Sequence, residues 1–182
     1  DGNPSNYQWD AWPSEQVWRR AIEWRGLQAG TIYIHSLEGI EALKEHLASG
    51  NLAVIGIEVY SNVDTYPNGQ YINNGVLYEY TKTGYRGSHA ITVIGYDDNK
   101  EYFDAIEGKT KKGAFLCVNS WGTDWGVYEE TMDSRGFIWL SYDFFIKKKV
   151  APEALIIIDR NNYKPEITAT IGINHTKGRM LL

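Results

Sequence analysis

The sequence predicts an α+β fold in which two helices precede a mostly antiparallel β-sheet. Apolar residues recur at helical spacing between residues 13 and 50. From residue 52 onward, short runs of β-branched and aromatic residues alternate with turns rich in Gly and Asn. Because the helices and the strands occupy separate stretches, we expect an α+β arrangement rather than repeating β-α-β units.

The first helix is predicted at about residues 13–25 and the second between Ser36 and Gly50. Their apolar positions are Val17, Trp18, Ala21, Ile22 and Trp24 in the first helix and Ile40, Leu43 and Leu47 in the second. A short extended segment is predicted between them, at residues 31–35.

The predicted strands cover residues 52–60, 76–80, 90–96, 101–106, 114–118, 136–141 and 153–159, with a further extended pattern at 167–173. Asp97-Asp98-Asn99 predicts a hairpin turn between two of these strands. An irregular tail is expected from Phe144 onward. The basic run at residues 109–112 is interpreted as a solvated hairpin tip.

Composition narrows the classes of partner. The 182 residues carry a net charge of −5 and have a pI near 5.4. Nucleic acid is therefore not an expected partner, since proteins that bind it gather Lys and Arg on one face. No stretch reaches the roughly 18 apolar residues needed to span a bilayer, so no membrane partner is expected. Cys117 is the only cysteine, which excludes an internal disulfide.

Two segments carry the chemistry. Residues 87–97 read Gly-Ser-His-Ala-Ile-Thr-Val-Ile-Gly-Tyr-Asp, so that His89 stands at the start of a predicted strand. Residues 115–126 read Phe-Leu-Cys-Val-Asn-Ser-Trp-Gly-Thr-Asp-Trp-Gly, so that Asn119 follows another predicted strand. A lone histidine or asparagine in such a position is usually structural. The combined match of both segments makes them candidates for catalysis.

These segments resemble the histidine and asparagine motifs of papain-like, or cathepsin-type, cysteine peptidases. In that family a His begins a strand that ends in Gly-Tyr-Asp, and an Asn opens Asn-Ser-Trp-Gly-x-x-Trp-Gly. The resemblance runs over residues 31–145. It implies a β-rich papain-like catalytic half at residues 31–158, a remnant of the helical part at 1–30, and at 159–182 a linker with the start of an appended β domain.

The resemblance also implies roles for three residues. A thiol attacks an amide only as thiolate, so it needs an adjacent base, and a histidine supplies one. The ring then returns its proton to the leaving amine, and a third group must hold it in position. By the resemblance, His89 is the base and acid, Asn119 accepts a hydrogen bond from its far nitrogen, and Trp121 covers that bond.

The family's nucleophile is not expected among these residues. Cys117 lies two residues before Asn119 within an apolar strand, where a thiol usually behaves as a small hydrophobic group. In the family the nucleophile lies about 130 to 150 residues before the histidine. That interval places it roughly 40 to 60 residues upstream of Asp1. The glutamine that stabilises the oxyanion is expected in the same upstream segment.

Residues that match the family's cleft wall predict an apolar substrate pocket, formed by Ile57, Gly87 and Ala90. Plain sheet packing would explain Ile57 and Ala90 equally well. The remaining histidines are His35, His46 and His175, and none has a Cys or carboxylate at ligand spacing. We therefore expect neither a metal nor another cofactor.

The leading hypothesis is that this chain is one part of a cysteine endopeptidase and is catalytically inactive when it is alone. Its expected partners are a protein or peptide substrate and the missing N-terminal half of the same enzyme. The alternative is a non-catalytic binding module derived from a peptidase. The seven Trp and thirteen Tyr residues favour it, because aromatic side chains suit a binding surface. A transglutaminase-like thiol hydrolase fits the Asn-Ser-Trp-Gly segment less well. The family is mostly extracellular or lysosomal, so the resemblance implies a secreted protein. The lack of disulfides fits a prokaryotic source better than a lysosomal one.

Overall fold

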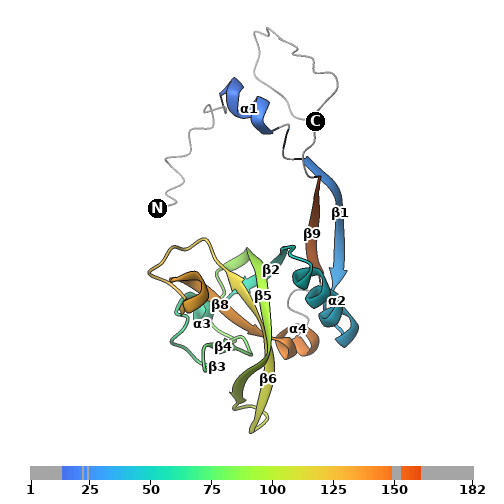
Figure 1. The fold of residues 1–182 in the computed structure, drawn as a ribbon. Coiled ribbons are helices and arrows are strands. Elements are labelled where there is room, and N and C mark those ends of the chain that lie inside the picture. The colour runs from blue at the N-terminus through green and yellow to red at the C-terminus, as the bar shows by residue number, and fades with distance from the viewer. Residues whose placement is uncertain (1–13, 22, 24, 149–152, 161–182) are drawn as a thin grey trace. The chain divides into compact units, whose positions relative to one another are not determined.

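The computed structural model describes residues 14–21, 23, 25–148 and 153–160 (Figure 1). The chain divides into two compact units, residues 28–158 and the two outer stretches 1–27 with 159–182. In the outer unit the described helix is α1 (Glu15–Ala21). No described helix combines the length and the apolar character needed to cross a bilayer. The predicted division at 1–30, 31–158 and 159–182 stays a proposal, and the extended pattern at 167–173 lies outside the described residues.

A nine-stranded sheet forms the larger unit, with strand order β1-β9-β2-β5-β6-β8-β4-β3 and β7 paired to β8. The strands are β1 (Arg25–Tyr33), β2 (Ala53–Val59), β3 (Ile72–Asn73), β4 (Val76–Leu77), β5 (Gly87–Asp104), β6 (Lys109–Val118), β7 (Val127–Glu129), β8 (Ser134–Ser141) and β9 (Glu153–Arg160). The helices are α2 (Leu37–Ala48), α3 (Ser61–Asp64) and α4 (Tyr142–Lys148), with a 3-10 turn at Glu130–Met132. The strand-rich α+β class is confirmed.

One face of the sheet carries the main core. Burial alternates strictly along β2, because successive side chains point to opposite faces of a strand. The buried set from β2 packs with apolar residues of α2 and with Phe144 and Phe145 of α4. Ser36 caps α2 by accepting the Gly39 N–H at 3.2 Å. Helices α2 and α4 therefore share one core with β2.

Strand β5 continues through the hairpin turn that was predicted at residues 97–99. Asp97 pairs with Ala114 and Glu101 with Lys112, so residues 98–100 form an irregularity in one long ladder with β6. The Asn99 N–H donates to Asp97 Oδ1 at 2.7 Å. This contact is the local side-chain turn that Asp and Asn residues favour. The hairpin prediction was wrong because pairing with β6 outweighs this local preference, and the chain turns at residues 105–108 instead.

Two further predictions are corrected. Residues after Ser141 form α4 rather than an irregular tail, since Phe144 and Phe145 are fully buried and Ser141 Oγ accepts the Phe144 N–H at 3.1 Å. The first helix ends at Ala21, and the extended segment begins at Arg25 because β1 finds a partner strand in β9.

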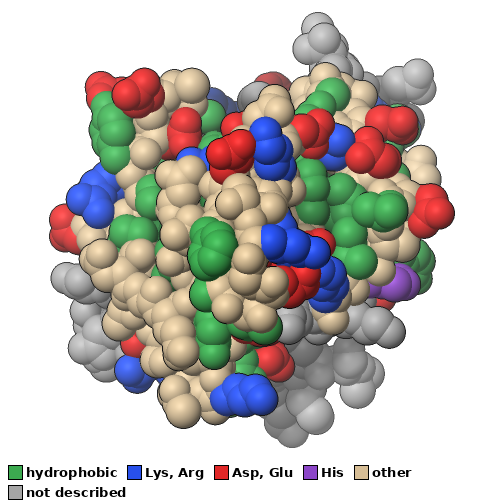
Figure 2. All heavy atoms as spheres, turned by 90° about the horizontal axis from the view of Figure 1, so that it is seen from below, with side chains coloured by type: hydrophobic (Ala, Val, Ile, Leu, Met, Phe, Trp, Pro, Cys, Tyr) green, Lys and Arg blue, Asp and Glu red, His purple; other side chains and the backbone are tan. Residues whose placement is uncertain are grey.

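The basic run at residues 109–112 is not simply a solvated tip. Its Lys111 side chain is 9% exposed and reaches Asp143 Oδ2 at 2.8 Å and Glu107 Oε1 at 2.7 Å. Burial lowers the pKa of Lys111, but hydrogen bonds to Asp104, Asp143 and Glu107 outweigh it, so that the net shift is upward. On the face that Figure 2 draws, Lys and Arg side chains lie beside Asp and Glu side chains.

The packing of α4 predicts a large stability cost for Phe144→Ala. Phe144 is fully buried, so the truncation should lower the free energy of unfolding by about 3–5 kcal/mol in urea denaturation. Phe103→Ala is the matched control, because Phe103 is 46% exposed and loses little on truncation. Equal losses in the two variants would contradict the placement of α4 in the core.

Candidate active site

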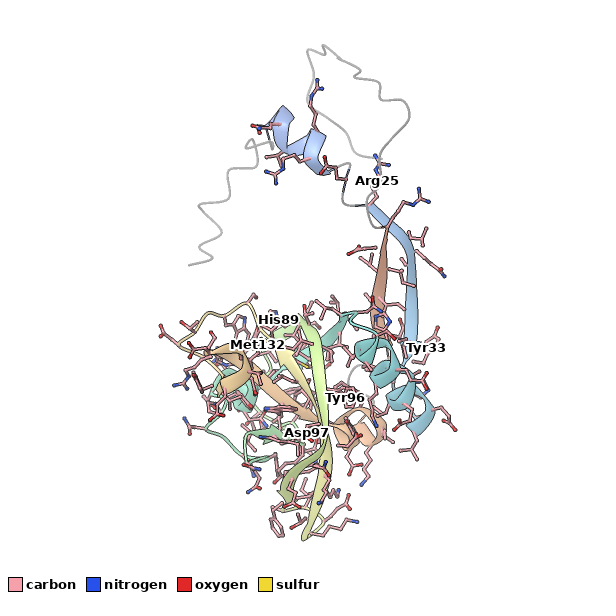
Figure 3. The ribbon with its side chains drawn as sticks, viewed as in Figure 1. Arg25, Tyr33, His89, Tyr96, Asp97 and Met132 are labelled. Carbon is pink, nitrogen blue, oxygen red and sulfur yellow. The ribbon has the colours of Figure 1, made fainter. Side chains whose placement is uncertain are left out.

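His89 lies at the start of β5, before the strand pairs with β6. Its backbone is opposite Ile57 of β2, and Figure 3 shows it at the end of β5 away from Tyr96 and Asp97. The side chain is half-buried. Its Nε2 lies 2.7 Å from Oδ1 of Asn119, the residue that follows β6. The structure thus brings together two residues that are 30 positions apart in the sequence.

The orientation of the Asn119 amide follows from a second contact. The Ser120 N–H donates to Asn119 Oδ1 at 2.7 Å, and the Asn119 N–H donates to Gly136 O at 2.9 Å. A backbone N–H requires an acceptor, so the atom that faces both Ser120 and His89 must be the oxygen. Nε2 of His89 is consequently the donor, and in the neutral ring Nδ1 is left as a proton acceptor.

Aromatic rings continue from His89 into the core. Trp121 stacks on the imidazole with a centroid separation of 5.0 Å and an interplanar angle of 28°. Trp125 meets Trp121 edge-on at 5.2 Å, and its indole N–H donates to Val63 O at 3.2 Å. The ring of Tyr66, itself 3% exposed, lies 5.3 Å from that of Trp125. Trp125 therefore supports Trp121, which covers one face of the His89 ring.

Glycine at position 126 has a steric reason. Its φ is +84°, and a Cβ there would lie 2.6 Å from Phe137 O and 2.7 Å from Phe137 N. Any larger residue would push this loop away from β8. Gly126 thus lets residues 119–126 fold closely against β8, which places Trp121 and Trp125.

The candidate pocket residues divide between the two faces of the sheet. Ile57 is 3% exposed and belongs to the core, so the pocket-lining role predicted for it does not fit its burial. Ala90 is exposed and Gly87 is half-buried. Gly56 lies opposite Ala90, and a Cβ there would meet open space. The accessible neighbour of Ala90 on β2 is therefore Gly56, which sequence analysis missed although the alternation of buried residues at 53, 55, 57 and 59 indicates it.

Cys117 is distant from His89. It is fully buried within β6 and pairs with Val93, four residues along β5 from the histidine. Four residues of strand span about 13 Å, far beyond the reach of proton transfer. Burial also raises the pKa of the Cys117 thiol well above its ordinary value, which disfavours the thiolate.

An acidic cluster among the described residues is already paired with a lysine. Asp104, Glu107 and Asp143 come close enough to share a cation, but Lys111 already contacts all three. The remaining histidines among the described residues are His35, which is exposed, and His46, whose Nε2 lies 3.0 Å from Leu52 O. His175 lies outside the described residues.

Comparison with known proteins identifies relatives of this arrangement. The model of a family described as papain family cysteine protease matches residues 20–141. Xylellain, a cysteine protease from Xylella fastidiosa, is 24% identical with a TM-score of 0.51, and the match covers 81% of this chain and 46% of xylellain. ProCathepsin B S9 from Trypanosoma congolense is 16% identical with a TM-score of 0.50, covering 76% and 37%.

These structural likenesses support the papain-like fold. The chain spans less than half the length of either solved structure. No curated protein sequence matches it significantly.

The burial of Cys117 predicts that its thiol is unreactive in the folded chain. In a Thr123→Cys variant, iodoacetamide should modify the exposed new thiol quickly and Cys117 only after unfolding. Raising the pH through about 8.5 should accelerate only the exposed thiol, because burial holds the Cys117 pKa higher. Mass spectrometry of the labelled peptides measures both rates, and comparable rates in the folded protein would refute this placement.

Proposed function

Because this chain belongs to the papain family of cysteine proteases, we propose that it supplies the base and the orienting group of a cysteine endopeptidase. The observation that carries the proposal is the 2.7 Å contact between His89 Nε2 and Asn119 Oδ1. This contact leaves Nδ1 as the proton acceptor and directs the ring through Asn119. The proposed substrate is a protein or peptide.

In the proposed reaction, Nδ1 of His89 takes the proton of a cysteine thiol located outside these 182 residues. The thiolate attacks the carbonyl carbon of the scissile peptide bond. As the C–N bond breaks, the imidazolium returns its proton to the departing amine, leaving an acyl-thioester. Water, deprotonated by the same nitrogen, then hydrolyses the thioester and regenerates the thiol. Asn119 keeps the proton on Nε2 throughout, and Trp121 shields one face of the ring.

The proposed substrate pocket lies beside His89. Gly87 and Ala90 flank the histidine, and the open space next to Gly56 would accommodate a substrate side chain opposite Ala90. A hydrophobic side chain fits this small, apolar stretch of surface. The other wall is proposed to come from the nucleophile-bearing part.

That part is the proposed partner of an exposed apolar surface, formed by Leu52, Val54, Leu155 and Ile157. Their exposed fractions are 55%, 40%, 54% and 65%. Val54 lies between Leu155 of β9 and Thr92 of β5, and the same side of β2 continues to Gly56, opposite Ala90. Apolar patches of this kind mark interfaces in soluble proteins.

Secretion of the protein and its prokaryotic source stay predictions.

The test combines this chain with the segment encoded upstream of Asp1 and measures cleavage of a fluorogenic peptide. His89→Ala should lower kcat at least about a hundredfold, because it removes the general base. Leu155→Lys should weaken association of the two parts while leaving the rate at saturation unchanged, because it places a charge in the apolar interface. Cys117→Ala is the control and should keep full activity.

Activity that survives His89→Ala, or that disappears in Cys117→Ala, would contradict the proposed roles. An upstream segment with Ser or Gly in place of the nucleophile would favour the alternative, a binding module that has lost catalysis. The chain alone should show no turnover.

A further inference from the structure

A second recess, here called the tyrosine groove, is lined by Tyr60, Tyr71, Glu79, Tyr80, Thr81, Lys82 and Ile106. Its volume is about 610 Å³, within the range of sites that bind small molecules and short peptide segments. It shares no lining residue with the His89 site. Tyrosines offer large, rigid and partly polar contact area at low entropic cost, which suits peptide binding.

Ring contacts connect the groove to the segment that precedes His89. The Tyr60 ring lies 5.0 Å from Tyr80 inside the groove and 5.3 Å from Tyr85 outside it. Tyr85 is 56% exposed and stands four residues before His89. Four residues of chain span at most about 14 Å, the length of four residues of extended peptide.

The β2–β5 ladder connects the two sites. The Arg86 N–H donates to Val59 O at 2.8 Å, and Val59 pairs with Gly87 just as Ile57 pairs with His89. Tyr60 and Tyr85 are therefore held at the end of the same ladder that positions the histidine.

The charged residues of the groove are of both signs. Glu79 and Lys82 place opposite charges among the tyrosine rings, so the lining favours neither a polyanion nor a polycation. Ile106 in the lining and the neighbouring Tyr85 ring outside it are exposed apolar groups, each 56% exposed. A segment of a protein substrate with a large apolar or aromatic side chain matches this mixture.

We propose that the tyrosine groove binds such a segment of the substrate, outside the residues that flank the scissile bond, as an extension of the cleft. The inference rests on the proposed peptidase function for the nature of its ligand. It requires no catalysis, and binding by the 182-residue chain can therefore be measured separately.

The test uses fluorescein-labelled dodecapeptides of Gly and Ser that carry Phe at alternating positions, with Ala at those positions in the control peptide. Fluorescence anisotropy should show the Phe peptides binding at least about tenfold more tightly. Tyr85→Ala and Tyr60→Ala should each weaken binding at least about fivefold, because each removes a contact ring, while Tyr60→Phe should retain it.

Tyr33→Ala is the matched control and should change binding less than twofold, because Tyr33 is 59% exposed and lies on β1, away from His89 in Figure 3. The binding assay involves no turnover, so its outcome does not depend on the proposed catalysis. Equal affinity for the Phe and Ala peptides, or binding that survives Tyr85→Ala, would overturn the proposal, whatever the outcome of the activity assay.

Discussion

The hydrogen bond between His89 Nε2 and Asn119 Oδ1 is the interaction on which the candidate site depends. At 2.7 Å it joins the start of β5 to the end of β6. The Ser120 N–H shares the same oxygen and so fixes which way the amide faces. Without that backbone donor the amide could turn and present its NH₂ to the ring, which would favour the other tautomer. A main-chain contact thus decides which nitrogen of His89 can accept a proton.

The His89–Asn119 pair lies at the end of the β5–β6 ladder. Pairing of β5 with β6 begins at Thr92 and Val118, so His89 lies three residues before the ladder and Asn119 one residue beyond it. On its other edge, β5 pairs with β2, where Ile57 lies opposite His89. The Asn119 N–H donates to the carbonyl oxygen of Gly136 in β8. Side chains at the end of a ladder have space that a close-packed ladder lacks. The same sheet buries Cys117 in its interior, away from the site.

Sequence analysis predicted the histidine and asparagine pair because both belong to long segments with specific spacing. It placed the hairpin wrongly, since the turn-forming residues Asp97 and Asn99 act locally while pairing with β6 is decided by distant residues. The burial of Lys111 depends on Asp104 and Asp143, which come together only in the fold. Gly56 could have been found from the alternation along β2, but the contacts of Ser120 with Asn119 could not.

The most direct test of the central claim is the position of the proton on His89. In a ¹⁵N-labelled chain at pH 8, long-range ¹H–¹⁵N correlation should show a proton on Nε2 and none on Nδ1. Exchange of the Nε2 proton with water should be slow in the parent chain and in Asn99→Ala, and fast in Asn119→Ala, because only the last variant removes the acceptor. A proton on Nδ1, or equal exchange in all three proteins, would contradict the account.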